Sequence, residues 1–128
     1  MTQKDKQLLL KDLCARVPYG VKINESAQGD FTVIGLTSER VFTTCETEGC
    51  HNDFPIECIK PYLFPISSMT DEEQRTLDSM CNGVEMVSRL SGLKMFDKAF
   101  NWLNENRFDY RGLIEKGLAI DATGLNIY

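Results

Sequence analysis

The sequence predicts an α+β protein in which an N-terminal helix and C-terminal helices pack on a small, strongly bent antiparallel sheet or SH3-like barrel. Runs rich in β-branched and aromatic residues fill the middle of the chain, polar breaks separate them, and helical periodicity flanks them on both sides. The 128 residues are 42% hydrophobic and 26% charged, which is a globular composition. One domain is expected over residues 1–128, with a helix and strands in residues 1–66 and helices in residues 67–128.

The first predicted element is an amphipathic helix from Gln3 to Arg16. Its apolar residues recur at helical spacing, with lysines elsewhere. They are Leu9, Leu10, Leu13, Cys14 and Val17. Because Pro18 disfavours helical backbone at the residue before it, the helix is expected to end near Arg16.

Four strands are expected to follow, at residues 19–23, 31–36, 41–45 and 54–59. The polar segments between the first three have the composition of hairpin loops. In the fourth strand, Pro55 indicates an edge or a bend, and alternation predicts that Ile56 and Cys58 share one face. Short strands with tight connections favour a strongly twisted sheet or a small barrel.

Residues 59–65 contain Pro61 and Pro65, so they are predicted to form a rigid turn rather than a central strand. A helix is then expected from Asp71 to about Cys81. Its start is marked by Thr70 as the N-cap, with Glu73 three residues later to complete a capping box.

The rest of the chain is predicted to be mainly helical. Residues 82–83, Asn-Gly, end the preceding helix, and residues 84–90 fit either a strand or a short helix. Residues 93–106 are expected to form the main packing helix, because apolar side chains recur at helical spacing. These side chains are Met95, Phe96, Ala99, Phe100, Trp102 and Leu103. A last short helix is predicted at residues 108–114, with Gly117 ending it.

Charge and cysteine content narrow the function classes. The net charge is −5, and residues 39–78 carry nine acidic and three basic side chains, which weighs against non-specific nucleic-acid binding. No apolar stretch approaches the roughly 20 residues that span a bilayer, so no membrane contact is expected. The N-terminus is not expected to be a signal peptide. Five cysteines without such a signal predict free thiols in the cytoplasm and no disulfide.

One cluster has the residue types of metal ligands: Cys45, Cys50, His51 and Cys58. Thiolates and an imidazole can bind zinc, but the paired C-x2-C knuckles typical of such sites are missing. A cysteine nucleophile with His51 as its base would also need an orienting group and an oxyanion hole, which the sequence does not indicate. We therefore expect no metal, no cofactor and no catalytic residue.

Recognition residues are predicted at Trp102, Tyr110 and Arg111, because these residue types are enriched at binding hot spots. The competing interpretation is that Phe108 and Tyr110 complete the core while Asp109 and Arg111 form a local surface pair. The residue pattern favours this second interpretation.

Two stretches carry a family resemblance. They are residues 59–70, IKPYLFPISSMT, and residues 101–119, in which NWL is followed by FDYRGLIEKGLA. They resemble small uncharacterised proteins of gut bacteria, their phages and mobile elements, which begin with a segment similar to residues 12–21, DLCARVPYGV. The resemblance implies an accessory protein of a phage or integrated element and implies no reaction.

The expected function is that of a non-enzymatic accessory module that binds an unidentified protein partner. The alternative is a nucleic-acid-binding SH3-like barrel, in which an aromatic face binds a peptide or a single strand. Its aromatic candidates are Tyr19, Phe31 and Phe42. Its cations would be Lys4, Lys6, Lys11, Arg16 and Lys22.

Overall fold

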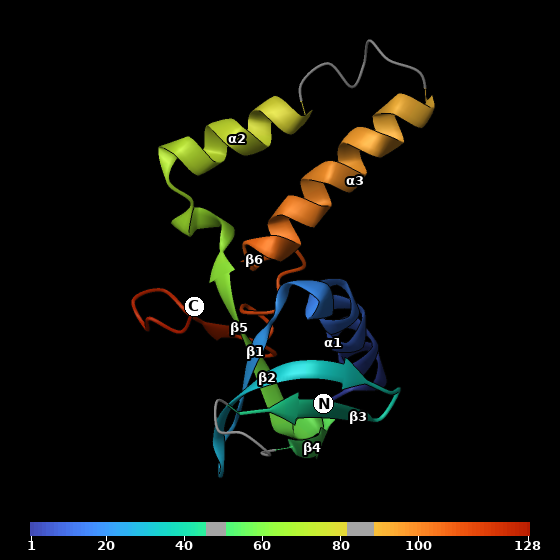
Figure 1. Ribbon diagram of the computed structural model, residues 1–128, viewed down its shortest axis with the longest axis vertical. Helices are drawn as coiled ribbons and strands as arrows, with labels where there is room; N and C mark the ends of the chain where they lie inside the picture. Colours follow the sequence, from blue (N-terminus) through green and yellow to red (C-terminus); the bar gives the residue numbers. More distant parts are fainter. Residues whose placement is uncertain (46–50, 82–88) are drawn as a thin grey trace.

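The computed structural model describes residues 1–45, 51–81 and 89–128 and shows an α+β fold (Figure 1). The helices are α1 (Gln3–Arg16), α2 (Asp71–Cys81) and α3 (Arg89–Glu105). The strands are β1 (Lys22–Glu25), β2 (Gly29–Leu36), β3 (Arg40–Thr44), β4 (His51–Pro55), β5 (Ile59–Pro65), β6 (Phe108–Asp109) and β7 (Ile120–Asp121). The predicted class, with a helix before the sheet and helices after it, is confirmed.

The described strands form one mixed, open sheet in the order β4-β3-β2-β1-β5-β6, with β7 also paired to β5. Neighbours from β4 to β5 are antiparallel, whereas β5 pairs with β6 and β7 in parallel. Because this path has two separate ends, β4 and β6, the strands do not close into the SH3-like barrel that was the alternative prediction. A register shift between Val33 and Gly35 marks a bulge that bends β2.

Helix α1 covers one face of the sheet and supplies the middle of the core (Figure 1). Leu9 and Leu13 are fully buried against strand residues that alternate toward the same side. These strand residues include Ile23, Phe31, Val33, Val41 and Leu63, and Val21 joins them from just before β1. The predicted bounds of α1 are confirmed, with a capping box at Thr2 fixing its start.

Strand β5 occupies the segment whose prolines predicted a rigid turn, so that prediction is wrong. Its first part pairs with β1, where Pro61 lies opposite Ile23, and its last part pairs with β7 and β6. Pro61 therefore removes at most one hydrogen bond of the ladder. Pro65 is the last residue of the strand, where a missing N–H costs least.

The single strand predicted over residues 54–59 is divided in the structure. Residues 56–58 make one turn of 3-10 helix between β4 and β5. Ile56 is fully buried whereas Cys58 is exposed, so the prediction that they share a face is wrong. A 3-10 turn has three residues, so side chains two apart point in different directions.

Helices α2 and α3 form a hairpin that extends away from α1 and the sheet (Figure 1). The predicted bounds of α2 and its capping box are confirmed: Thr70 N–H donates to Glu73 Oε1 at 2.9 Å, and Glu73 N–H donates to Thr70 Oγ1 at 3.2 Å. No residue of α2 is buried. Residues 84–90 were predicted to form either a strand or a short helix. Residues 84–88 lie outside the described part of the chain, and α3 begins at residue 89.

Helix α3 is only partly the packing helix that its apolar pattern predicts. Ala99 and Leu103 are buried, but Leu93, Phe96 and Phe100 are 65%, 43% and 47% exposed. The apolar side chains cover a wider arc of the helix than α2 and the sheet can bury together. None of the described helices combines the length and the apolar run needed to cross a membrane.

The short helix predicted at residues 108–114 does not form. The chain instead makes β6 and continues in turns. The Asp109 carboxylate accepts hydrogen bonds from the N–H groups of Leu113 and Ile114, both at 2.9 Å. Gly112 has a φ of 75°, in the left-handed region that glycine adopts at little cost. The carboxylate therefore stabilises a turn where the apolar spacing predicted a helix.

Truncation to alanine should change the free energy of unfolding far more at a core residue than at an exposed residue of α3. Leu13→Ala removes a fully buried side chain and should lower the free energy of unfolding by about 2 to 5 kcal/mol. Leu93→Ala removes a side chain that is 65% exposed and should change it by about 0.5 kcal/mol or less. Urea unfolding measures both, and a large loss for Leu93→Ala would place that residue in the core.

Candidate functional site

An apolar stripe runs along the exposed side of α3. It consists of Leu93, Phe96 and Phe100, and we call it the α3 stripe. Residues at i, i+3 and i+7 lie one above another on a helix, so the three side chains form one continuous row. Single exposed apolar residues are ordinary on a protein surface, but a contiguous row of large ones indicates an interaction site.

Tyr110 continues the α3 stripe past the end of the helix. Its ring centroid lies 5.3 Å from that of Phe100, with the planes tilted by 46°. Its hydroxyl donates to Asn104 Oδ1 at 3.0 Å, and Asn104 itself is buried. Tyr110 is therefore held in place at both ends of its side chain while one part of it remains exposed to solvent.

A charged cluster lies directly beside Tyr110. It consists of Asp12, Arg16 and Arg111, and we call it the Asp12 cluster. Arg16 donates from Nε to Asp12 Oδ2 at 2.8 Å and from Nη2 to Asp12 Oδ1 at 3.0 Å. Arg111 Nη1 donates to the same Oδ1 at 2.9 Å. The guanidinium carbons lie 5.5 Å (Arg16) and 4.5 Å (Arg111) from the Tyr110 ring centroid, within reach of cation–π attraction.

The structure thus brings two of the three predicted recognition residues together and separates the third. Tyr110 and Arg111 are neighbours, but Trp102 lies on another side of α3 from Phe100, because residues two apart on a helix do not face each other. Trp102 stacks on Phe108 at 5.7 Å, in an aromatic group that continues to Phe64 at 6.4 Å. Trp102 therefore lies away from the α3 stripe.

Sequence reasoning missed Asp12 and Arg16. Arg16 was placed among the cations of a nucleic-acid surface, yet its side chain is fully buried against Asp12. A signal for this pair exists in the sequence: the two residues are four apart and lie on the same side of α1 as Leu9 and Leu13. Opposite charges at this spacing on an apolar face indicate a buried pair.

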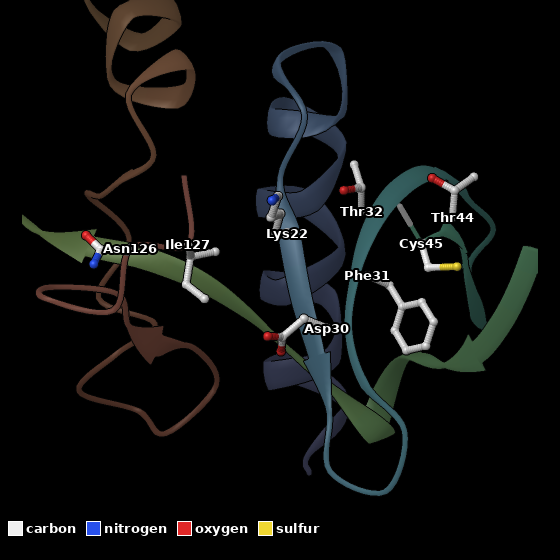
Figure 2. A pocket seen from close by; sticks show the side chains of 8 residues that line it. All are labelled: Lys22, Asp30, Phe31, Thr32, Thr44, Cys45, Asn126 and Ile127. Carbon is white, nitrogen blue, oxygen red and sulfur yellow. The ribbon is translucent and has the colours of Figure 1, made fainter. Parts of the chain in front are cut away.

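A polar pocket of about 400 Å³ lies elsewhere, between the sheet and the C-terminal residues Asn126 and Ile127 (Figure 2). The strand register places Lys22, Thr32 and Thr44 in one row across β1, β2 and β3. The other lining residues are Asp30, Phe31 and Cys45.

The candidate metal cluster does not assemble among the described residues. Cys45 is disulfide-bonded, so it is not available as a thiolate, and the prediction that every cysteine is a free thiol is wrong there. Cys58 is exposed with a free thiol, as are Cys14 and Cys81. His51 is exposed at the start of the edge strand β4, and Cys50 lies outside the described residues. No three described His, Cys, Asp or Glu side chains are grouped to hold a metal.

Comparison with known proteins gives no family for this chain. It matches no family model, no curated protein and no solved structure. The resemblance to proteins of gut bacteria and their phages therefore stays a prediction.

Removing the charge of Asp12 should destabilise the protein strongly. Asp12→Asn leaves two guanidinium groups without their carboxylate, and one of them is fully buried. We expect the free energy of unfolding to fall by about 3 to 5 kcal/mol. Asp53→Asn is the matched control, because it breaks an exposed pair with Arg40 and should cost about 1 kcal/mol or less. Equal losses of unfolding free energy for the two variants, measured by urea unfolding, would contradict the assignment of Asp12 to a buried charged cluster.

Tyr62 should make stability pH-dependent at alkaline pH. Its hydroxyl donates to Asp30 Oδ1 at 2.6 Å, and burial followed by this hydrogen bond raises the pKa of Tyr62 to about 12. An unfolded tyrosine loses its proton near a pKa of about 10. Because the folded state then binds more protons, the free energy of unfolding falls as pH rises from about 10 to about 12.

The variant Tyr62→Phe isolates this contribution. It lacks the ionisable hydroxyl, so its free energy of unfolding should fall less steeply over the same pH range. Tyr128 is retained in both proteins; its own pKa is raised by burial and contributes equally. Identical pH slopes for the two proteins in urea unfolding would show that Tyr62 is not protected by the fold.

Proposed function

We propose that the protein is a non-enzymatic accessory module that binds another protein through the α3 stripe and Tyr110. The observation that carries this proposal is the exposure of Leu93, Phe96 and Phe100, which are 65%, 43% and 47% accessible in the single chain. Covering such side chains with a partner removes apolar surface from water, which is the main favourable term in most protein association. Aromatic side chains are also enriched at interfaces.

The position of the hairpin supports this role. Helix α2 has no buried residue, so the hairpin contributes little to the core around α1. The α3 stripe is therefore not explained by folding of the single chain. A projecting helix with one apolar side is a shape that a second helix can contact along its length.

The remaining chemistry supports binding rather than catalysis. Asp12 and the two arginines around it are bonded to one another, and Asp109 is bonded to backbone N–H groups of its own turn. His51 is exposed at the sheet edge. Neither the pocket of about 400 Å³ nor a second one of about 340 Å³ is lined by His51 or Cys58.

The alternative function, binding of nucleic acid, loses part of its support. At least two of the five cations that motivated it are engaged within the chain. Lys6 pairs with Glu39 and Glu57, and its hydrogen bond to Glu39 raises its pKa. Arg16 is fully buried with Asp12. Both are therefore less available to phosphate groups than the sequence suggests.

The proposal includes an origin and a compartment. The resemblance of residues 59–70 and 101–119 supports an accessory protein of a phage or mobile element. Three exposed free thiols, at Cys14, Cys58 and Cys81, support a reducing compartment such as the cytoplasm. The disulfide at Cys45 counts against that compartment.

Capture experiments with matched variants test the function. The tagged chain is expressed in its host, and bound proteins are compared for the wild type, for Phe96→Ser with Phe100→Ser, and for Ile34→Ser with Phe42→Ser. The last pair removes side chains that are 54% and 41% exposed on the sheet. We expect the α3 variant to lose a partner that the wild type and the sheet variant retain.

Two controls accompany this experiment. Both double variants should unfold within about 1 kcal/mol of the wild type, because all four side chains are exposed. Nuclease treatment should leave capture unchanged. Capture that survives the α3 substitutions, or that disappears with nuclease, contradicts binding of a protein through the α3 stripe.

A further inference from the structure

The Asp12 cluster carries more positive than negative charge. Asp12 contributes one carboxylate, whereas Arg16 and Arg111 contribute two guanidinium groups. Asp109 is not a member of the cluster, because its carboxylate accepts hydrogen bonds from the N–H groups of its own turn. The group of three therefore has a net charge of about +1 at neutral pH.

One donor of this cluster is also unsatisfied. Arg16 Nη1 is buried and has no hydrogen-bond partner among the described residues, although the other nitrogens of this guanidinium bond to Asp12 and to the Phe108 carbonyl. A buried donor without a partner is unfavourable, and an excess positive charge in the same place adds to that cost. A carboxylate brought to the exposed part of the cluster would offset the excess positive charge.

Arg111 connects this charge to the α3 stripe. Its side chain is 19% exposed, so it is the member of the cluster that a partner can reach. Its guanidinium lies 4.5 Å from the Tyr110 ring centroid, and Tyr110 lies 5.3 Å from Phe100. The surface is therefore apolar along α3 and positively charged at its end nearest the sheet and α1.

We infer that the partner presents an amphipathic helix with an acidic side chain at the end that meets Arg111. This inference rests on the proposed function and specifies the partner's chemistry. The apolar residues of such a helix, spaced i, i+3 or i+4 and i+7, cover the α3 stripe. Its aspartate or glutamate then accepts hydrogen bonds from Arg111, whose planar guanidinium suits a carboxylate.

A displayed helical peptide library provides the test. The library fixes a helical scaffold and randomises the exposed positions along one side and at both ends among apolar, polar and charged residues. We expect selection on the intact wild-type chain to enrich apolar residues at helical spacing, together with Asp or Glu at one end only. Selection on Arg111→Gln should retain the apolar pattern and lose the acidic preference.

Affinities of one selected peptide then measure the contact. The peptide and its Glu→Gln or Asp→Asn counterpart are titrated with the wild type, Arg111→Gln and Lys98→Gln. Lys98 is the matched control because it lies two residues from Phe96 and Phe100, on another side of α3. Arg111→Gln should weaken binding of the acidic peptide about tenfold and leave binding of the amide peptide almost unchanged. Lys98→Gln should not produce a tenfold loss of affinity for either peptide.

The other outcomes separate the two proposals. Apolar enrichment without an acidic end overturns the inference and leaves the proposed function standing. A wild type that selects no helical peptide contradicts both. Self-association of the chain in sedimentation equilibrium, abolished by Phe96→Ser with Phe100→Ser, overturns the inference because a second copy then covers the α3 stripe. Unfolding curves for Arg111→Gln establish that the variant tested is folded.

Discussion

The carboxylate of Asp12 holds together parts of the chain that are distant in sequence. It bonds Arg16 within α1 and Arg111 near the C-terminus, and Arg16 in turn donates to the Phe108 carbonyl of β6 at 2.7 Å. These bonds fasten the N-terminal helix to β6, the parallel strand at one end of the sheet. Breaking such a buried pair is costly because it leaves an uncompensated charge away from water. The arrangement around Tyr110 therefore depends on this one group.

The proposed binding surface follows from the same constraint. Tyr110 comes directly after β6, and its ring lies over the guanidinium groups that Asp12 orients. Phe100 reaches that ring from α3. The apolar and charged parts of the surface are thus positioned by different elements that meet at one aromatic side chain. Binding of a partner that contacts both parts therefore depends on how α1, α3 and β6 pack together.

Local signals in the sequence predicted the elements whose bounds are set by residues close to one another in the chain. The bounds of α1 and α2 follow from capping boxes and helical spacing, and both are confirmed. Strand β5 could not be predicted in the same way, because pairing on its two sides outweighs the propensity of Pro61. The periodicity of α3 identified its apolar arc, but which part of that arc is buried depends on the neighbours. Arg111 was predicted as a recognition residue, while its partner Asp12 lies 99 positions earlier in the chain.

The separation of the hairpin from the core has an evolutionary consequence. Substitutions on the exposed side of α3 and along α2 remove few buried contacts, so they leave the sheet and α1 folded. The sequence can therefore diverge in this region without compensating mutations elsewhere. Under the proposed function, a few changes on these two helices would be enough to replace one partner by another.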